Sequence, residues 1–208
     1  VALCPAPLYH GAPMRAVRPV HMAGGTVVVM DKFDPREALR LIEKHRVTHG
    51  QWVPTMFVRM LRLPEADRLC HDLSSLESAV HAAAPCPQDV KRQMNDRWGP
   101  ILHGFYGPPD GAGNTSIGCE EWLAHPGSVG RAPVTLHVCD EIGNEVMPGE
   151  SGLLYFEGKE PLPYYLNDPE KTRSTRHPTQ DKWVCVGDIG RVGDDGYLYL
   201  TDRKAFTI

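Results

Sequence analysis

The chain has 208 residues, of which 41% are hydrophobic and 23% are charged, and its formal net charge is −4 at pH 7. These values are typical of a globular protein and exclude a disordered one. They also argue against nucleic-acid binding, because there is neither a net positive charge nor a run of lysine and arginine. The length suffices for one substantial core or two small ones.

The two ends of the sequence and its cysteines bear on where the protein works. The first residues, Val1–Pro5, lack the charged and apolar regions of a signal peptide or membrane span, and Leu198–Lys204 leads from an expected strand into charged residues. We therefore expect an internal fragment of a longer protein, without a transmembrane segment. Its six cysteines contain no close pair, so neither a zinc motif nor a disulfide framework is indicated. A reduced, cytoplasmic environment fits best, whereas the oligomeric state is not indicated.

The first predicted elements form a strand-helix-strand unit. The β-branched run Thr26–Met30 is typical of a strand buried on both faces. Asp34, Pro35 and Glu37 then predict a helix start, with a side-chain cap, a proline in the first turn and a capping-box partner. Thr48–Val53 is expected to return as the next strand. The helix between them carries a stripe formed by Leu39, Leu41, Ile42 and His45.

Predicted helices and strands continue to alternate in the next part of the sequence. Met56–Leu63 is expected to be a helix and Leu76–Ala82 a strand. Pro87 predicts the start of another helix, Gly99 predicts its left-handed end, and residues 101–103 resume extended structure. The side chains on one face of that helix are Val90, Met94 and Trp98. This order predicts an α/β fold with a mainly parallel sheet and flanking helices.

From about Gly130 the pattern changes to short strands separated by turn residues. We therefore predict an α/β subdomain over residues 1–130 and a small antiparallel β subdomain over residues 131–201. The expected strands are Val134–Asp140, Gly152–Glu157, Trp183–Val186 and Tyr197–Thr201.

Three segments, in order, resemble one family. They are Ala82–Pro85 with Gly104–Gly107, Trp183–Gly190 running into Asp194–Leu198, and Thr201–Lys204. Together they resemble the adenylate-forming (AMP-binding) superfamily of acyl-CoA synthetases, aryl-CoA ligases, luciferases and peptide-synthetase adenylation domains. The connecting segments are similar too, so the resemblance covers nearly the whole chain. The amino-acid sequence of these segments is most similar to that of bacterial fatty-acyl-CoA synthetases.

The resemblance implies an ATP-dependent acid–thiol ligase. In this family a carboxylic acid, here expected to be a fatty acid, attacks the α-phosphate of ATP, pyrophosphate leaves, and coenzyme A displaces AMP from the acyl adenylate. ATP, Mg²⁺ and coenzyme A are the implied cofactors, and a small-molecule carboxylic acid is the implied partner. Residues 202–208 match the start of the family's hinge. The expected phosphate-binding loop and C-terminal domain lie outside the sequence, so we expect the fragment alone to be inactive.

The resemblance assigns nucleotide-binding roles to several residues. Tyr106 would stack on adenine, a contact worth roughly 1–3 kcal/mol; Asp188 would accept hydrogen bonds from the ribose hydroxyls, and Arg203 would reach ribose or phosphate. A strand-end aromatic, a turn aspartate and an exposed ion-pairing arginine are the alternatives. The remaining residues assigned to the nucleotide are Ala83, Ala84, Pro85, Phe105, Gly107 and Pro109.

Two positions carry expected catalytic roles, and a third departs from the family. His10 matches a residue that gates the acyl tunnel, with a structural histidine as the alternative. Asp110 stands where the family has a magnesium-binding glutamate, and its shorter carboxylate still suits Mg²⁺. Pro109 replaces a phosphate-binding threonine and offers neither a hydroxyl nor an N–H. A catalytically degenerate nucleotide- or acyl-binding module is therefore a second hypothesis, and an unrelated carrier or scaffold is a third.

Overall fold

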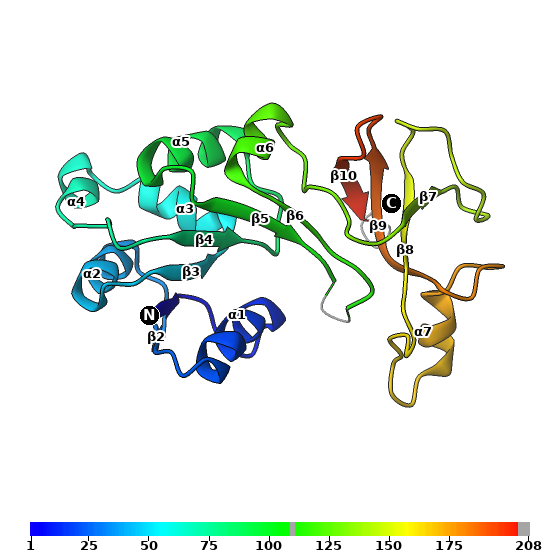
Figure 1. The fold of residues 1–208 in the computed structure, drawn as a ribbon, viewed down its shortest axis with the longest axis horizontal. Helices are drawn as coiled ribbons and strands as arrows, with labels where there is room; N and C mark the ends of the chain where they lie inside the picture. Colours follow the sequence, from blue (N-terminus) through cyan, green and yellow to red (C-terminus); the bar gives the residue numbers. More distant parts are fainter. Residues whose placement is uncertain (109–110, 204–208) are drawn as a thin grey trace. The chain divides into compact units, whose positions relative to one another are not determined.

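The computed structural model describes residues 1–108 and 111–203, which divide into two compact units (Figure 1). The first unit comprises Val1–Gly104 and Gly118–Gly127. The second comprises Phe105–Ile117 and the described residues from Ser128 onward. The polypeptide therefore passes between the units more than once, instead of dividing at a single point.

The first unit contains a parallel sheet with the strand order β2-β1-β3-β4-β5. This confirms the predicted mainly parallel α/β architecture. The strand predicted to be buried on both faces lies instead at the edge of the sheet, where Val29 is 50% exposed, because β2 pairs only with β1. The strands are β1 (Ala2–Cys4), β2 (Val27–Val29), β3 (His49–Trp52), β4 (Ser78–His81) and β5 (Leu102–Tyr106).

Helices flank this sheet (Figure 1). They are α1 (Gly11–Met22), α2 (Pro35–His45), α3 (Pro54–Leu61), α4 (Glu65–Leu69), α5 (Gln88–Trp98) and α6 (Cys119–Ala124). Apolar residues of α2, α3 and α5 form one core with Leu3, Ala79 and Leu102 of the strands. Helix α1 packs against β1, β2 and β3, and the two residues that it buries, Pro13 and Val17, lie outside that core.

The helix signals in the sequence act largely as expected. The Asp34 carboxylate accepts a hydrogen bond of 2.9 Å from the backbone N–H of Glu37, which confirms the predicted cap of α2. The Glu37 carboxylate, however, bonds Arg40 at 2.6 and 2.7 Å instead of closing a capping box. Gly99 has the predicted positive φ, +80°, but its ψ of −171° lies outside the left-handed helical region. Only glycine adopts that combination readily.

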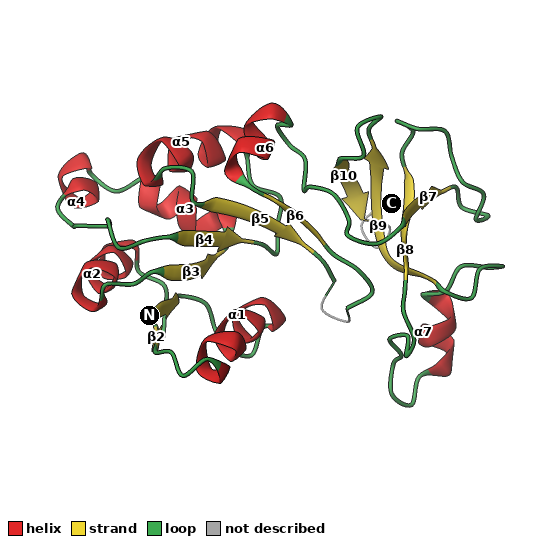
Figure 2. Ribbon diagram, in the orientation of Figure 1, coloured by secondary structure: helices red, strands yellow, loops and turns green. Residues whose placement is uncertain are grey.

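The second unit is built on an antiparallel sheet with the order β10-β9-β8-β7 (Figure 2). Its strands are β7 (Leu136–Cys139), β8 (Gly152–Glu157), β9 (Trp183–Val192) and β10 (Leu198–Arg203), and it also contains β6 (Thr115–Ile117) and α7 (Pro169–Ser174). The antiparallel prediction is confirmed. Strand β9 runs on past its predicted end at Val186.

Each unit has its own apolar cluster. The cluster on the antiparallel sheet consists of Cys139, Leu153, Tyr155 and Cys185, with Trp183 and Ile189 packed against it. Its two cysteines are buried and free, as a core role predicts. Among the residues that the structure describes, no helix combines the length and the apolar character needed to cross a membrane.

Candidate functional site

Three of the residues singled out in the sequence meet in the second unit, around the carboxylate of Asp188. The Tyr106 hydroxyl donates a hydrogen bond of 2.6 Å to Oδ2 of Asp188. Nε of Arg203 lies 3.3 Å from Oδ1 of the same carboxylate. The Asp188 side chain is 17% exposed and that of Arg203 is 56% exposed. One largely buried acceptor is thus held between a phenol and a guanidinium.

The position of Asp188 depends on an irregularity where β8 pairs with β9. Leu153 lies opposite Ile189, whereas Tyr155 lies opposite Cys185. Residues 186–188 of β9 therefore face Leu154 alone. Gly187, at the middle of this bulge, has a φ of +83°, a backbone conformation that other residues adopt only with strain.

A second irregularity, between β9 and β10, selects the partner of Asp188. Leu200 pairs with Gly190 and Asp202 pairs with Ile189, so the register skips Thr201. Arg203 consequently lies opposite Asp188. A regular ladder would instead place Asp202 opposite Asp188, and like charges in that position are destabilising.

Tyr106 is the last residue of β5 and acts as a hydrogen-bond donor at neutral pH. Burial, together with the hydrogen bond to Asp188, raises the pKa of Tyr106 well above its usual range. The phenol therefore keeps its proton and can donate a hydrogen bond to the carboxylate. The ring centroid lies 6.3 Å from that of Phe156 on β8, at an interplanar angle of 35°.

The segment after Tyr106 is packed closely at two glycines. A Cβ on Gly107 would lie 2.9 Å from Cβ of Asn114, and one on Gly113 would overlap Cγ of Phe156. Gly113 therefore lies directly against the ring that neighbours Tyr106. Pro109 and Asp110 lie outside the described residues, so the phosphate and magnesium roles expected of them stay predictions.

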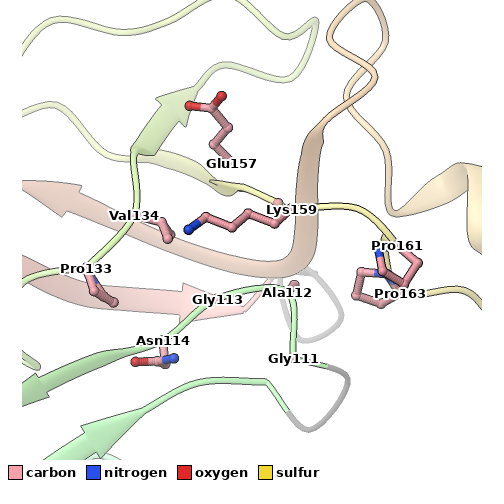
Figure 3. Close-up of a pocket in the computed structure, with 11 residues that line it drawn as sticks. Gly111, Ala112, Gly113, Asn114, Pro133, Val134, Glu157, Lys159, Pro161 and Pro163 are labelled. Carbon is pink, nitrogen blue, oxygen red and sulfur yellow. The ribbon is translucent and has the colours of Figure 1, made fainter.

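An open pocket lies along the same segment (Figure 3). It has a volume of about 350 Å³ and is lined by residues 111–114, by Pro133 and Val134, and by the last residue of β8, Glu157, with residues that follow it. Lys159 is the cation among its lining residues. No motif in the sequence distinguished Lys159 or Phe156, because their placement depends on contacts between segments far apart in the chain.

Phe105 precedes Tyr106 in β5 and belongs to the second unit, whereas the remaining predicted site residues lie in the first unit. Ala83, Ala84 and Pro85 follow β4 and are exposed. Ala83 has a φ of +74°, which is uncommon for a residue with a side chain and is found preferentially at functional sites. His10 is exposed at the N-cap of α1, and its ring centroid lies 4.4 Å from that of Tyr9. The roles expected of these five residues stay predictions.

Within residues 1–108 and 111–203, no three histidine, cysteine, aspartate or glutamate side chains converge as a metal site. The expected magnesium ligand, Asp110, is not among those residues.

The fold, with a largely parallel sheet flanked by helices and a separate antiparallel sheet, is that of an α/β protein of the adenylate-forming class. The chain belongs to the AMP-binding enzyme family, whose model matches residues 1–166. It is 36% identical to 4-coumarate–CoA ligase-like 6 of Oryza sativa subsp. japonica over 209 residues, which cover 98% of this chain and 34% of that protein.

Two further proteins extend this comparison. The chain is 30% identical over 184 residues to the long-chain-fatty-acid–CoA ligase of Bacillus subtilis (strain 168), covering 87% of this chain and 32% of that one. The structure of the amide bond synthetase McbA from Marinactinospora thermotolerans matches with a TM-score of 0.82 at 28% identity, over 97% of this chain and 41% of that one. The chain thus spans about a third of the length of these two curated relatives. These relatives include a coumarate-type ligase and a fatty-acid ligase. The comparison therefore does not distinguish a resemblance to fatty-acyl-CoA synthetases from one to aryl-CoA ligases.

Proposed function

We propose that this chain supplies the nucleoside-binding half of the acyl-adenylate site in an ATP-dependent acid–thiol ligase. The contact of Tyr106, Asp188 and Arg203 around one carboxylate is the observation that supports this proposal. Tyr106 contacts Oδ2 of Asp188 and Arg203 contacts Oδ1, and an ionised carboxylate can accept about four hydrogen bonds in all. We expect the capacity beyond these two contacts to serve the two neighbouring hydroxyls of a ribose.

The other two side chains would complete this subsite. Arg203 is more than half exposed and carries further N–H donors for ribose or phosphate oxygens. Tyr106 is partly exposed, so that its ring can cover an adenine while its hydroxyl stays on Asp188. Ala83, Ala84, Pro85, Phe105 and Gly107 are expected to line the adenine edge.

In the proposed reaction, ATP would supply the adenylyl group, Mg²⁺ would neutralise the phosphates, and coenzyme A would supply the thiol that displaces AMP. Asp110 is the proposed magnesium ligand, and His10 is the proposed gate of the acyl site. Asp188 and Arg203 would not take part in proton transfer. Their role is to hold the ribose so that the α-phosphate is correctly oriented toward the attacking carboxylate.

For the acid, we propose a fatty acid. The similarity to the Bacillus subtilis long-chain-fatty-acid–CoA ligase supports this class. A hydroxycinnamic acid is the competing class, supported by the similarity to the Oryza sativa protein. Pyrophosphate release from ATP, measured on the chain extended at both ends to the length of its relatives, would distinguish them by comparing palmitate with 4-coumarate.

Nucleoside binding can be tested on the present chain by calorimetric titration with adenosine. Asp188→Asn keeps the shape of the side chain but removes its charge and half of its acceptor capacity, so we expect adenosine affinity to fall by about tenfold or more. Asp181→Asn is the matched control, because Asp181 is exposed and lies in the same unit. Equal adenosine affinity of both variants and the unsubstituted chain would rule out the proposed subsite.

A second candidate function, a degenerate nucleotide-binding module, is favoured by the Pro108-Pro109 pair in the sequence. The extended chain bearing Pro109→Thr and Asp110→Glu should then gain carboxylate-dependent pyrophosphate release that the unsubstituted chain lacks. Equal release with and without these substitutions would remove the basis for this alternative.

A further inference from the structure

Some of the residues that line the pocket in Figure 3 lie against Phe156 or follow it directly in sequence. The rings of Tyr106 and Phe156 are neighbours, with centroids 6.3 Å apart. Gly113, which lines the pocket, lies so close to the Phe156 ring that any side chain on it would clash. Glu157, Gly158 and Lys159 then follow Phe156 directly and line the pocket as well. A ligand held at Tyr106 would therefore have this pocket beside it.

Lys159, the cation among the pocket's lining residues, has no hydrogen-bonding or ion-pair partner among the residues that the structure describes. Lys159 is exposed, and Figure 3 shows its side chain extending into the pocket toward Val134, past Ala112 and Gly113. Within the described parts of the chain, its ammonium makes neither an ion pair nor a hydrogen bond. A flexible lysine whose charge is not neutralised by its neighbours is available to bind an anion.

The rest of the lining suits a compact anion. Gly111, Ala112 and Gly113 bring backbone close to the pocket with almost no side-chain bulk, and Pro133 and Val134 form an apolar wall. Phosphate, which needs close approach and a cation, fits such a lining. Glu157 also lines the pocket and has the opposite effect, because its carboxylate repels an anion. The pocket should therefore bind phosphate weakly enough to release it.

We propose that this pocket binds a phosphate group and that Lys159 is the residue that holds it. The proposal rests on the proposed function for the nature of the neighbouring ligand. A phosphate could belong either to the polyphosphate of the nucleotide, which leaves as pyrophosphate, or to coenzyme A. In the first case, Lys159 supplies a phosphate contact in a protein whose sequence has a proline, without a side-chain donor, at position 109.

Calorimetric titration of the 208-residue chain with inorganic pyrophosphate tests the proposal. A charge-assisted contact at an exposed lysine predicts that Lys159→Ala lowers pyrophosphate affinity by about tenfold, and that Lys159→Arg restores most of it. Glu157→Gln should act in the opposite direction and raise affinity by roughly two- to fivefold, because it removes a repulsive charge. Lys32→Ala is the control, since it changes the net charge equally at an exposed position in the first unit.

The outcomes separate clearly. A selective loss in Lys159→Ala, with Lys32→Ala unchanged, supports the site. Equal affinity of Lys159→Ala and the unsubstituted chain overturns it, as does an absence of pyrophosphate binding by the unsubstituted chain. Titration with adenosine 3′,5′-bisphosphate identifies the source of the phosphate, because a larger loss with this probe than with pyrophosphate would indicate the coenzyme.

Failure of this proposal can be distinguished from failure of the proposed function. Adenosine carries no phosphate, so its binding should depend on Asp188 and be unchanged in Lys159→Ala. If the chain binds adenosine but not pyrophosphate, the phosphate-site proposal alone is refuted. If it binds pyrophosphate in a Lys159-dependent way but does not bind adenosine, the phosphate site is supported and the proposed nucleoside subsite is refuted.

Discussion

Replacing Tyr106 with phenylalanine removes one hydroxyl from the site and keeps the aromatic ring. The lost bond is 2.6 Å long and has a carboxylate as its acceptor. Hydrogen bonds to charged groups contribute about 1.5–3 kcal/mol to stability. Asp188 keeps its contact with Arg203 and is partly open to water, so we take the lower end of that range. Tyr106→Phe should therefore reduce the free energy of unfolding by about 1.5 kcal/mol at pH 7.

The same substitution should change how stability depends on pH. Burial and Asp188 raise the pKa of Tyr106 in the folded chain above the ordinary value of 10.0. The contribution of this tyrosine is therefore complete below pH 10 and is lost as the pH rises further, because the unfolded chain then releases the proton first. The loss amounts to about 1.4 kcal/mol per pH unit, so the two proteins should become nearly equal in stability by about pH 11.

Urea denaturation of both proteins at several pH values measures this difference, and the remaining tyrosines cancel in the comparison. Tyr164→Phe is the matched control, because Tyr164 is 71% exposed and should show neither effect. A stability difference below about 0.5 kcal/mol at pH 7 would refute the assigned hydrogen bond. A difference that stays constant between pH 8 and 11 would refute the raised pKa of Tyr106.

Three further substitutions test the packing around the two sheets. Gly187→Ala should cost about 1–2 kcal/mol in urea denaturation, because φ is +83° while, apart from the two chain neighbours, no atom of the described residues lies within 4 Å of an added Cβ. Gly187→Asn should cost less, and equal costs would contradict a purely conformational penalty. Lys91 is 1% exposed, its ammonium lies 4.7 Å from the centroid of the Trp122 ring, and burial lowers the pKa of Lys91 to about 8. Stability should therefore rise by about 1.4 kcal/mol per unit as the pH increases from 8 toward 10.5, and Lys91→Met should abolish that rise; an unchanged pH profile would show that Lys91 is not the group responsible. Gly113→Ala should destabilise by more than about 2 kcal/mol through its clash with Phe156, and Phe156→Leu in the same chain should recover part of the loss, whereas strictly additive effects would argue against the contact.

Elements with strong local signals were predictable from the sequence, and α1 shows why others were not. The start of α2 is specified by Asp34 together with Pro35, within four residues of chain. Helix α1, by contrast, follows His10, whose side chain makes no capping hydrogen bond, and it buries only Pro13 and Val17. Without a cap or an apolar stripe, it had no signal to detect. Its formation depends on packing against the parallel strands.

The position of β2 at the edge of the sheet was likewise not predictable from the sequence. A run of three valines is compatible with any place in a sheet, and Val29 is exposed only because the strand order leaves β2 with a neighbour on one side. Strand order is set by the whole unit and not by the strand's own residues.

The candidate site, like the fold, could be predicted from the sequence only in part. Resemblance identified Tyr106, Asp188 and Arg203 individually. Their mutual contacts depend on two register shifts and on a hydrogen bond that spans 82 positions in sequence. Gly187 was the one local indication of the first shift, since glycine permits its positive φ. Nothing in the sequence around Thr201 indicated that the register would skip this residue.

The two contacts of Asp188 also have a consequence for the energetics of recognition. A carboxylate that is already fixed by a 2.6 Å hydrogen bond loses little rotamer freedom when a ligand arrives, so the ordering cost has been met during folding. The Arg203 side chain also approaches this carboxylate, at 3.3 Å, but it is 56% exposed, so part of its rotamer freedom is still to be lost when a ligand binds. The aspartate is thus preorganised and the arginine adapts. Adenosine binding should accordingly show a smaller entropic penalty at Asp188 than at Arg203.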